Sequence, residues 1–281
     1  MLSIVCGVIT AVIFATGTLI SARLSRSLGP FIVVAWASML GLIMTLPFAL
    51  ARGLPDGVSL GVWAGLTMAG LGNVAGFACV FMALRYGKVG LVAPVVATEG
   101  AVAAILAAIT GRSIAPLVAF LLALIMVGIV IAARSPDPVP MPHERNGRAV
   151  LLGSGGSLGF GISLFTVGVL SGTLPLEWVL IPGRVVGTVA VALPLLIAGR
   201  LTVTWRALPF LAILAATDIV GLVVYSIGAQ ESLPITAVMA SQMAPISAVM
   251  AYFFFKERLS RGQLAGMVVI IVGISLLSLV E

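Results

Sequence analysis

Charged and chemically reactive side chains are scarce in this sequence. Only 9% of its 281 residues are charged, whereas soluble domains have about 25%. There are two cysteines and one histidine, and the sequence has no Cys/His cluster, Walker loop or Ser/His/Asp set. Metal sites, cofactors and nucleophilic catalysis therefore lack the residues they need, and we expect neither a cofactor nor enzyme activity.

Apolar residues take the place of the missing charges. They make up 61% of the chain, and its mean hydropathy is +1.25. No soluble fold of this length can bury so much apolar surface, so we expect a multi-pass membrane protein embedded in a lipid bilayer. The net charge of +6 comes from Lys and Arg scattered through short loops. This pattern fits the positive-inside rule and argues against nucleic acid as a partner.

Apolar stretches of spanning length divide the chain into two sets of five. A spanning helix needs about 20 apolar residues. The predicted helices cover residues 3–22, 30–51, 59–84, 89–110, 116–133, 149–170, 176–198, 207–230, 235–255 and 263–280. Between the sets lies the only long polar stretch, the proline-rich segment 134–148, which predicts an extended linker. We therefore predict an all-α membrane protein of ten transmembrane helices, with repeats at 1–133 and 149–281.

The second half of the chain echoes the first at an offset of about 145 residues. Loop ends, small-residue helices and a closing glycine-containing helix recur in Met82–Gly128 and Gly228–Gly273. Two copies of a unit with an odd number of crossings must be inverted relative to each other. Inverted repeats that meet at the bilayer midplane, around a central cavity, are typical of secondary transporters.

The basic residues predict the orientation. Twelve Lys and Arg side chains fall in the loops after every odd-numbered predicted helix, and only Arg52 and Arg112 fall on the opposite side. Loops rich in Lys and Arg stay in the cytoplasm. We therefore expect the twelve-charge face to be cytoplasmic and both termini to be outside.

The C-terminal part of the chain carries a recognisable pattern. Pro245 lies within a predicted helix, the turn Glu257-Arg258-Leu259-Ser260 follows, and Gln263-Leu264-Ala265-Gly266 begins the next helix. This resembles the EamA repeat of the drug/metabolite transporter superfamily, which has a mid-helix proline, a Glu-x-Leu-Ser/Thr turn and then Gln-x-x-Gly. In the first half, Pro94 matches more loosely, and Gly111-Arg112-Ser113 stands where the acidic turn would be.

The resemblance implies a fold and a class of function. Members have two inverted five-helix halves, in which the first, third and fourth helices of each line a central cavity. Relatives with ten helices include bacterial amino-acid exporters and eukaryotic nucleotide-sugar and triose-phosphate translocators. The resemblance therefore implies a small polar metabolite as substrate and a bacterial inner membrane as location. Termini of the eukaryotic relatives are usually cytosolic, but we follow the charge count.

Three charged residues fall in the middle of predicted helices: Glu99, Arg184 and Asp218. A charge at the bilayer centre costs about 2.5–3.5 kcal/mol on insertion scales, so such residues are candidates for function. Glu99 either binds a substrate amine or exchanges a proton for it, or it is a structural partner of Arg184 or of the backbone. Asp218 aligns with Asn73 in the repeat, so the two either face each other across the cavity or fix helix packing. Arg184 either clamps a substrate carboxylate or pairs with Asp218 or Glu99.

Weaker candidates surround these charges. Polar contacts with substrate are expected from Thr98, Ser241 and Gln242, and ring stacking from Phe77 and Tyr225. Trp63, Trp178 and Trp205 lie near predicted helix ends and are expected to anchor the protein at the membrane interface. Glu257 is expected to cap its turn or to pair with Lys256, Arg258 or Arg261 rather than to bind substrate.

These features favour a secondary active exporter of a small polar metabolite, working by alternating access. Because candidate charges of both signs are present, an amino acid or related zwitterion is the first choice of substrate, with protons as a candidate coupling ion. A multidrug or organic-cation exporter is the alternative, and a non-transporting membrane scaffold is the alternative of a different class. The sequence leaves open a monomer or a homodimer.

Overall fold

The computed structural model describes residues 1–53, 58–109, 116–134, 144–170 and 174–280. Within these residues the regular elements are helices joined by short connections, and no strand is present. The predicted all-α class is therefore confirmed. Most of the predicted linker (135–143) and the segment Gly111-Arg112-Ser113 lie outside the described residues.

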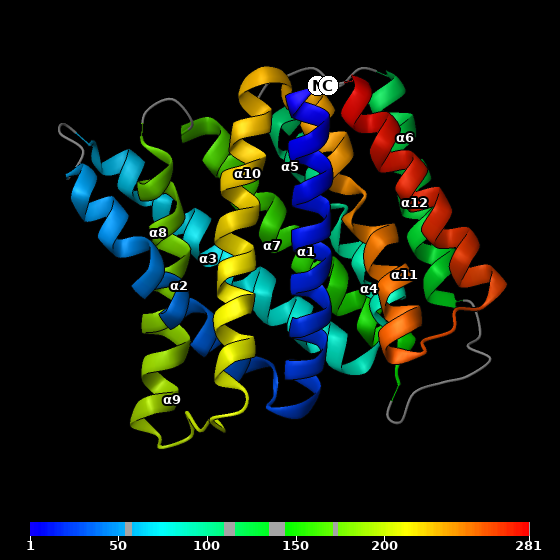
Figure 1. The fold of residues 1–281 in the computed structure, drawn as a ribbon. Coiled ribbons are helices and arrows are strands. Elements are labelled where there is room, and N and C mark those ends of the chain that lie inside the picture. The colour runs from blue at the N-terminus through cyan, green and yellow to red at the C-terminus, as the bar shows by residue number, and fades with distance from the viewer. Residues whose placement is uncertain (54–57, 110–115, 135–143, 171–173, 281) are drawn as a thin grey trace.

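The first half contains α1 to α6 and the second half α7 to α12 (Figure 1). The first six helices are α1 Leu2–Ser27, α2 Pro30–Arg52, α3 Leu60–Tyr86, α4 Val89–Val96, α5 Glu99–Ile109 and α6 Pro116–Arg134. The second half has α7 Asn146–Leu170, α8 Leu176–Gly187, the π-helical turn Thr188–Ala192, α9 Leu193–Ile197, α10 Leu208–Ser241, α11 Met243–Phe255 and α12 Arg261–Val280. Five helical segments of the described chain are long and apolar enough to cross a membrane: Leu2–Ser27, Pro30–Arg52, Leu60–Tyr86, Leu180–Ile197 and Leu208–Gly228.

The predicted helix 89–110 is interrupted in the structure. α4 ends at Val96 and α5 begins at Glu99, with Ala97 and Thr98 between them. Pro94 lies just before the interruption, and proline lacks the N–H that a continuous helix needs. The interruption gives Glu99 the first position of a helix.

Between residues 230 and 235, where the sequence predicts a short loop, the backbone is helical. α10 is helical from Leu208 to Ser241, and the interruption falls at Gln242. The chain nevertheless reverses within this segment. The evidence is that a Cβ on Gly228 would lie 3.0 Å from the side chain of Thr236. Residues eight apart in a straight helix are about 12 Å apart. Figure 1 shows this reversal, where the ribbon rises in α10, turns and descends into α11.

Prolines explain two further departures from regular helix. The ring of Pro245 clashes with the carbonyl four residues earlier, which belongs to Ser241, where α10 ends. Pro194 cannot donate to residue 190, which lies in the π-helical turn before α9. A π-turn shifts the hydrogen-bond pattern by one residue and absorbs this loss.

Helices of the two halves pack against one another. α1 lies along α10, α3 along α7, α4 against α11, and α6 against α12. Glycines make this possible: a Cβ on Gly72 would lie 2.7 Å from the carbonyl oxygen of Gly159, and a Cβ on Gly266 would lie 2.7 Å from that of Gly128. Close backbone approach through small residues is the usual basis of helix association in membranes.

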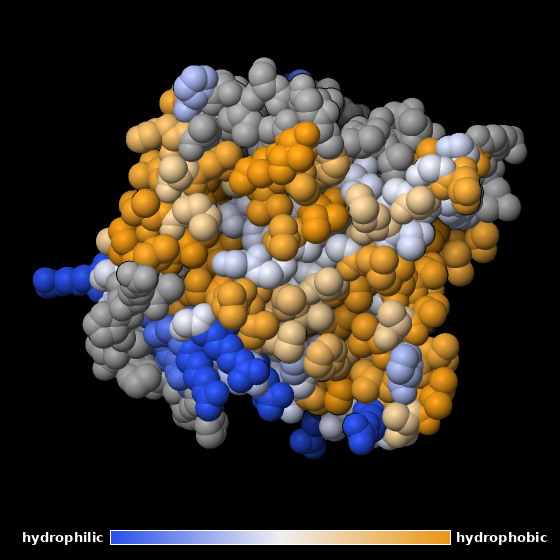
Figure 2. Space-filling view, turned by 180° about the vertical axis from the view of Figure 1, so that it is seen from behind, coloured by the Kyte–Doolittle hydropathy of each residue, from blue (hydrophilic) through white to orange (hydrophobic). Residues whose placement is uncertain are grey.

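The surface separates an apolar belt from a charged end. On the face seen in Figure 2, hydrophobic side chains cover most of the surface, and the most hydrophilic residues gather towards the lower edge. In Figure 1, α1 begins and α12 ends at the opposite end of the bundle. Trp63 and Trp205 are exposed, as expected of interface anchors, but Trp178 is buried and its Nε1 donates to the Gly53 carbonyl over 2.9 Å. Trp178 therefore holds a helix end in place.

Glu257 connects the two halves at the charged end. Its Oε1 accepts a hydrogen bond from Nη2 of Arg26 over 2.8 Å, and its Oε2 accepts one from the backbone N–H of Val89 over 2.8 Å. Lys88 Nζ donates to the Arg258 carbonyl beside it. The expected partners of Glu257 were its neighbours in the turn; its observed partner Arg26 belongs to the other half of the chain.

The residues after Glu257 form a capping box that begins α12. The Gln263 side chain accepts from the Ser260 backbone N–H over 2.9 Å, and the Gln263 N–H donates to the Ser260 hydroxyl over 3.2 Å. Reciprocal bonds of this kind satisfy N–H groups that the first turn leaves without partners. The motif Glu-x-Leu-Ser-x-x-Gln therefore combines a contact between the halves with a helix start.

Candidate functional site

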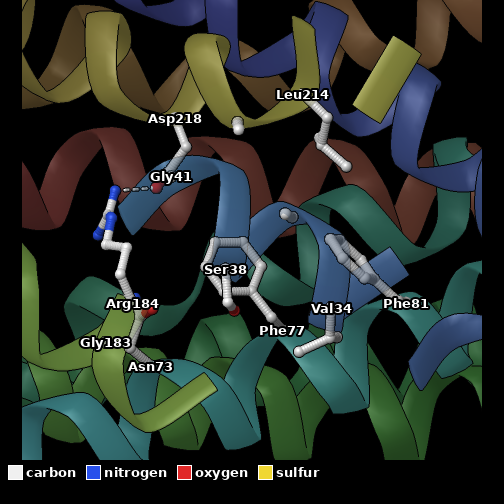
Figure 3. A pocket seen from close by; sticks show the side chains of 12 residues that line it. Val34, Ser38, Gly41, Asn73, Phe77, Phe81, Gly183, Arg184, Leu214 and Asp218 are labelled. Carbon is white, nitrogen blue, oxygen red and sulfur yellow. Dashed lines mark hydrogen bonds and ion pairs between the residues drawn. The ribbon is translucent and has the colours of Figure 1, made fainter. Parts of the chain in front are cut away.

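Two adjoining cavities lie between helices of both halves. The larger has a volume of about 200 Å³ and the smaller about 40 Å³. Both are lined by the same five residues, which form a shared wall: Asn73, Phe77, Phe81, Leu214 and Asp218. Figure 3 shows the smaller cavity, in which α3 and α10 contribute this wall.

The larger cavity is lined by one face of α1. Phe14, Gly17, Thr18 and Ser21 follow the i, i+3, i+4, i+7 spacing that places side chains on one side of a helix. A Cβ on Gly17 would lie 2.8 Å from the hydroxyl of Thr217 on α10, so this glycine allows the close approach of α1 and α10.

Arg184 and Asp218 form an ion pair between α8 and α10 (Figure 3). Nη2 of Arg184 donates to Oδ2 of Asp218, and Nη1 donates to the Leu180 carbonyl over 3.1 Å. The Arg184 side chain is 7% exposed and the Asp218 side chain 29% exposed. Among the alternatives that the sequence left open for Arg184, the structure shows the intramembrane pair with Asp218.

Glu99 lines the larger cavity from the start of α5. Its neighbour Thr98 is buried and bonds to other protein groups: its hydroxyl donates to the Val95 carbonyl over 2.7 Å and lies 2.7 Å from the Ser157 hydroxyl on α7. Thr98 therefore fixes the interruption between α4 and α5, and the interruption positions Glu99.

The structure brings together most of the residues singled out in the sequence. Glu99, Asp218, Asn73 and Phe77 line the larger cavity, and Arg184 reaches their shared wall from the smaller one. Two other candidates do not line the cavities. Gln242 Nε2 donates to the Ser275 hydroxyl on α12 over 3.2 Å, and Tyr225 is not among the residues that line either cavity. The side chain of Ser241 lies outside the described part of the chain.

Several lining residues were missed by sequence reasoning. They are mainly small hydroxyl residues and phenylalanines: Phe14, Thr18, Ser21, Phe160, Ser163 and Thr217. The regular spacing of Thr18 and Ser21 on α1, and the position of Thr217 beside Asp218, were the available signals.

The larger cavity combines carboxyl groups with aromatic rings. Its described lining includes Glu99 and Asp218, four phenylalanines (Phe14, Phe77, Phe81 and Phe160), and no Lys, Arg or His. Phe77 packs edge-on against Phe160, with ring centroids 4.9 Å apart, and lies 5.5 Å from Phe81. Such a surface attracts a cation with an apolar body, because both carboxylates and ring faces carry negative potential.

Comparison with known proteins identifies the family. The model of the EamA-like transporter family matches residues 1–134 and again residues 147–279. The chain belongs to this family. The resemblance to the drug/metabolite transporter superfamily is thus confirmed, and this EamA-like protein is a multi-pass membrane transporter.

Two other comparisons add less. No curated protein matches the chain. A solved structure described only as "Crystal structure of protein" is similar at 18% identity and a TM-score of 0.59, over 99% of this chain and 97% of the other. At this identity the likeness supports the fold alone.

Proposed function

We propose that this EamA-like protein is a secondary active exporter of a small organic amine. In this proposal ten membrane crossings form two inverted five-helix repeats, which open the larger cavity to each side of the membrane in turn. The two interrupted crossings are α4 with α5, and the end of α10 (after its reversal) with α11. The location is a bacterial inner membrane, with both termini outside and protons as the coupling ion. The observation that carries the proposal is the lining of the larger cavity, which has two carboxyl groups, four phenylalanines and, among the described residues, no cationic side chain.

The substrate class follows from the partners that the cavity offers to a substrate ammonium and to a substrate carboxylate. An ammonium group would find Glu99 and Asp218, and a hydrocarbon or aromatic body would contact the phenylalanine rings. An amino acid also brings a carboxylate, which needs a cation. Arg184 is already paired with Asp218 and lines only the smaller cavity. We therefore rank an amine above the zwitterion that the sequence favoured.

Size argues against a bulky substrate. Pockets for drug-sized ligands usually have about 300–1,000 Å³, and the larger cavity has about 200 Å³. An ammonium group has three N–H donors, and a carboxylate need not accept all of them. The hydroxyls of Thr18, Ser21, Ser163 and Thr217 can accept the remaining hydrogen bonds. These features favour a compact primary amine over a lipophilic multidrug cation.

Proteoliposomes test the proposal with a matched set of solutes. Labelled phenethylamine, phenylalanine and phenylpropionate share one aryl body and differ only in the amine and carboxylate. We expect transport of phenethylamine and competition by other small amines. Transport of phenylalanine alone would favour the amino-acid exporter, and transport of tetraphenylphosphonium alone would favour the multidrug exporter. If none of these solutes is transported, the non-transporting membrane scaffold would be the remaining hypothesis.

A further inference from the structure

The position of Asp218 between the two cavities gives it two possible cationic partners. Asp218 lines both cavities, whereas Arg184 lines only the smaller one. The pair joins a single guanidinium nitrogen, Nη2, to a single carboxylate oxygen, Oδ2. Oδ1 of Asp218 accepts no hydrogen bond from the described residues, and the side chain keeps 29% of its exposure.

Arg184 is held in the smaller cavity by contacts on its own side. Nη1 donates to the Leu180 carbonyl one turn earlier in α8. Gly41 on α2 leaves room for the side chain, because a Cβ there would lie 3.3 Å from Cγ of Arg184. The arginine is therefore anchored at one end of its guanidinium, and its other end is available for Asp218.

We propose that Arg184 is a built-in competitor of the substrate cation for Asp218 and thereby sets the affinity of the site. This inference rests on the proposed function in one respect, namely that the substrate is a cation. A substrate ammonium in the larger cavity binds the Asp218 carboxylate on the side that faces away from Arg184. Binding then weakens the Arg184–Asp218 pair, and departure of the substrate restores it.

Arg184 also compensates charge in the cavity when no substrate is bound. Without substrate, Glu99 and Asp218 would place two carboxyl groups in one cavity between apolar helices. Arg184 neutralises one of them. A transporter without this arginine would hold its substrate more tightly and would return empty more slowly, since uncompensated charge at membrane depth is unfavourable.

The test measures binding and transport in the same variant. Phenethylamine binding to the purified full-length protein is followed by titration calorimetry, and both net efflux and exchange are followed in proteoliposomes. For Arg184→Gln we expect affinity to rise about 5- to 150-fold, the usual range of coupling between two linked equilibria. Net efflux should fall while phenethylamine exchange is retained, because only net efflux needs the empty site to reorient. A residue with a purely structural role would lower all three quantities together.

A second variant keeps the test decisive if Arg184→Gln does not fold. Lysine at position 184 is a shorter, more strongly hydrated point charge that cannot reproduce the planar guanidinium contacts, so Arg184→Lys should be a weaker competitor and raise affinity by a smaller factor. If the wild type binds phenethylamine and neither variant binds it more tightly, the inference is overturned and the proposed function stands. If the wild type binds no amine, both are overturned.

Discussion

Replacing Glu257 should weaken the contact between the two halves of the chain at their charged end. Glu257 is buried, with 4% of its side chain exposed, and Arg26 is 25% exposed. In Glu257→Ala, Arg26 loses its carboxylate partner and the Val89 N–H loses its acceptor. Arg26 keeps its bonds to the Leu84 and Gly87 carbonyls, which lie 2.9 and 3.0 Å away.

The expected loss of stability is the sum of two effects. A hydrogen bond to a charged group contributes about 1.5–3 kcal/mol, and a buried N–H without an acceptor is unfavourable by about 1–3 kcal/mol. Removing one partner of a buried ion pair is typically destabilising by about 3–5 kcal/mol. Since Arg26 keeps two acceptors and some contact with solvent, we expect about 3 kcal/mol for Glu257→Ala, at the lower end of that range.

Unfolding in detergent by increasing fractions of dodecyl sulfate measures this loss. A double-mutant cycle with Arg26→Ala isolates the pair and should give a coupling of about 1.5–3 kcal/mol. Arg23→Ala is the matched control, because Arg23 is exposed on the same helix and its interaction among the described residues is with the ring of Phe210, whose centroid lies 5.9 Å from Cζ. We expect a change of at most about 1 kcal/mol for that control. A loss below 1 kcal/mol for Glu257→Ala, or additive effects with Arg26→Ala, would refute the reasoning.

Three further predictions concern other contacts. In Gly159→Val, the new Cβ would lie 2.6 Å from the Gly72 carbonyl oxygen, so we expect thermal unfolding to show a loss of stability of about 1–3 kcal/mol. Gly147→Ala is the control and should be tolerated, because a Cβ there would meet open space. Gln263→Ala removes the capping box of α12 and should lower stability by about 0.5–2 kcal/mol in the same assay; equal stability to wild type would contradict the role of the box. Hydrogen bonds from the hydroxyl and the N–H of Ser3 lower the pKa of Glu231, which lies just after the apolar span Leu208–Gly228 of α10. This contact therefore stabilises the fold above the unfolded-state pKa and is lost as pH falls through the folded-state pKa. The protection of the amides near Ser3 against hydrogen exchange, measured relative to the intrinsic exchange rate at each pH, should therefore fall under acid in the wild type and show no such acid step in Glu231→Gln.

The parts of the fold that were predictable depend on continuous apolar sequence. The runs that became α1, α2 and α3 are long and lack an interrupting charge, so length alone located them. Interruptions were harder, because Pro94 and Pro245 both disturb a helix but do not specify where it resumes. The reversal between Gly228 and Thr236 falls where the sequence predicts the break between two helices, but the backbone there is helical and not an extended loop.

The candidate site was predictable as a set of residues but not as a set of pairs. Glu99, Arg184 and Asp218 stand out because each lies within apolar sequence. Whether Arg184 meets Asp218 or Glu99 depends on how α8 and α10 are rotated, which hydropathy does not determine. The partner of Glu257 is 231 residues away, so the sequence favoured nearby cations that the structure does not use.

Uptake of phenethylamine by proteoliposomes that contain Glu99→Gln or Glu231→Gln tests the central claim most directly. The two variants make the same chemical change, one in the larger cavity and one at an exposed position of α10. The account predicts that Glu99→Gln abolishes saturable phenethylamine transport and that Glu231→Gln retains it. Equal transport by both variants would contradict the claim that the larger cavity binds the substrate amine.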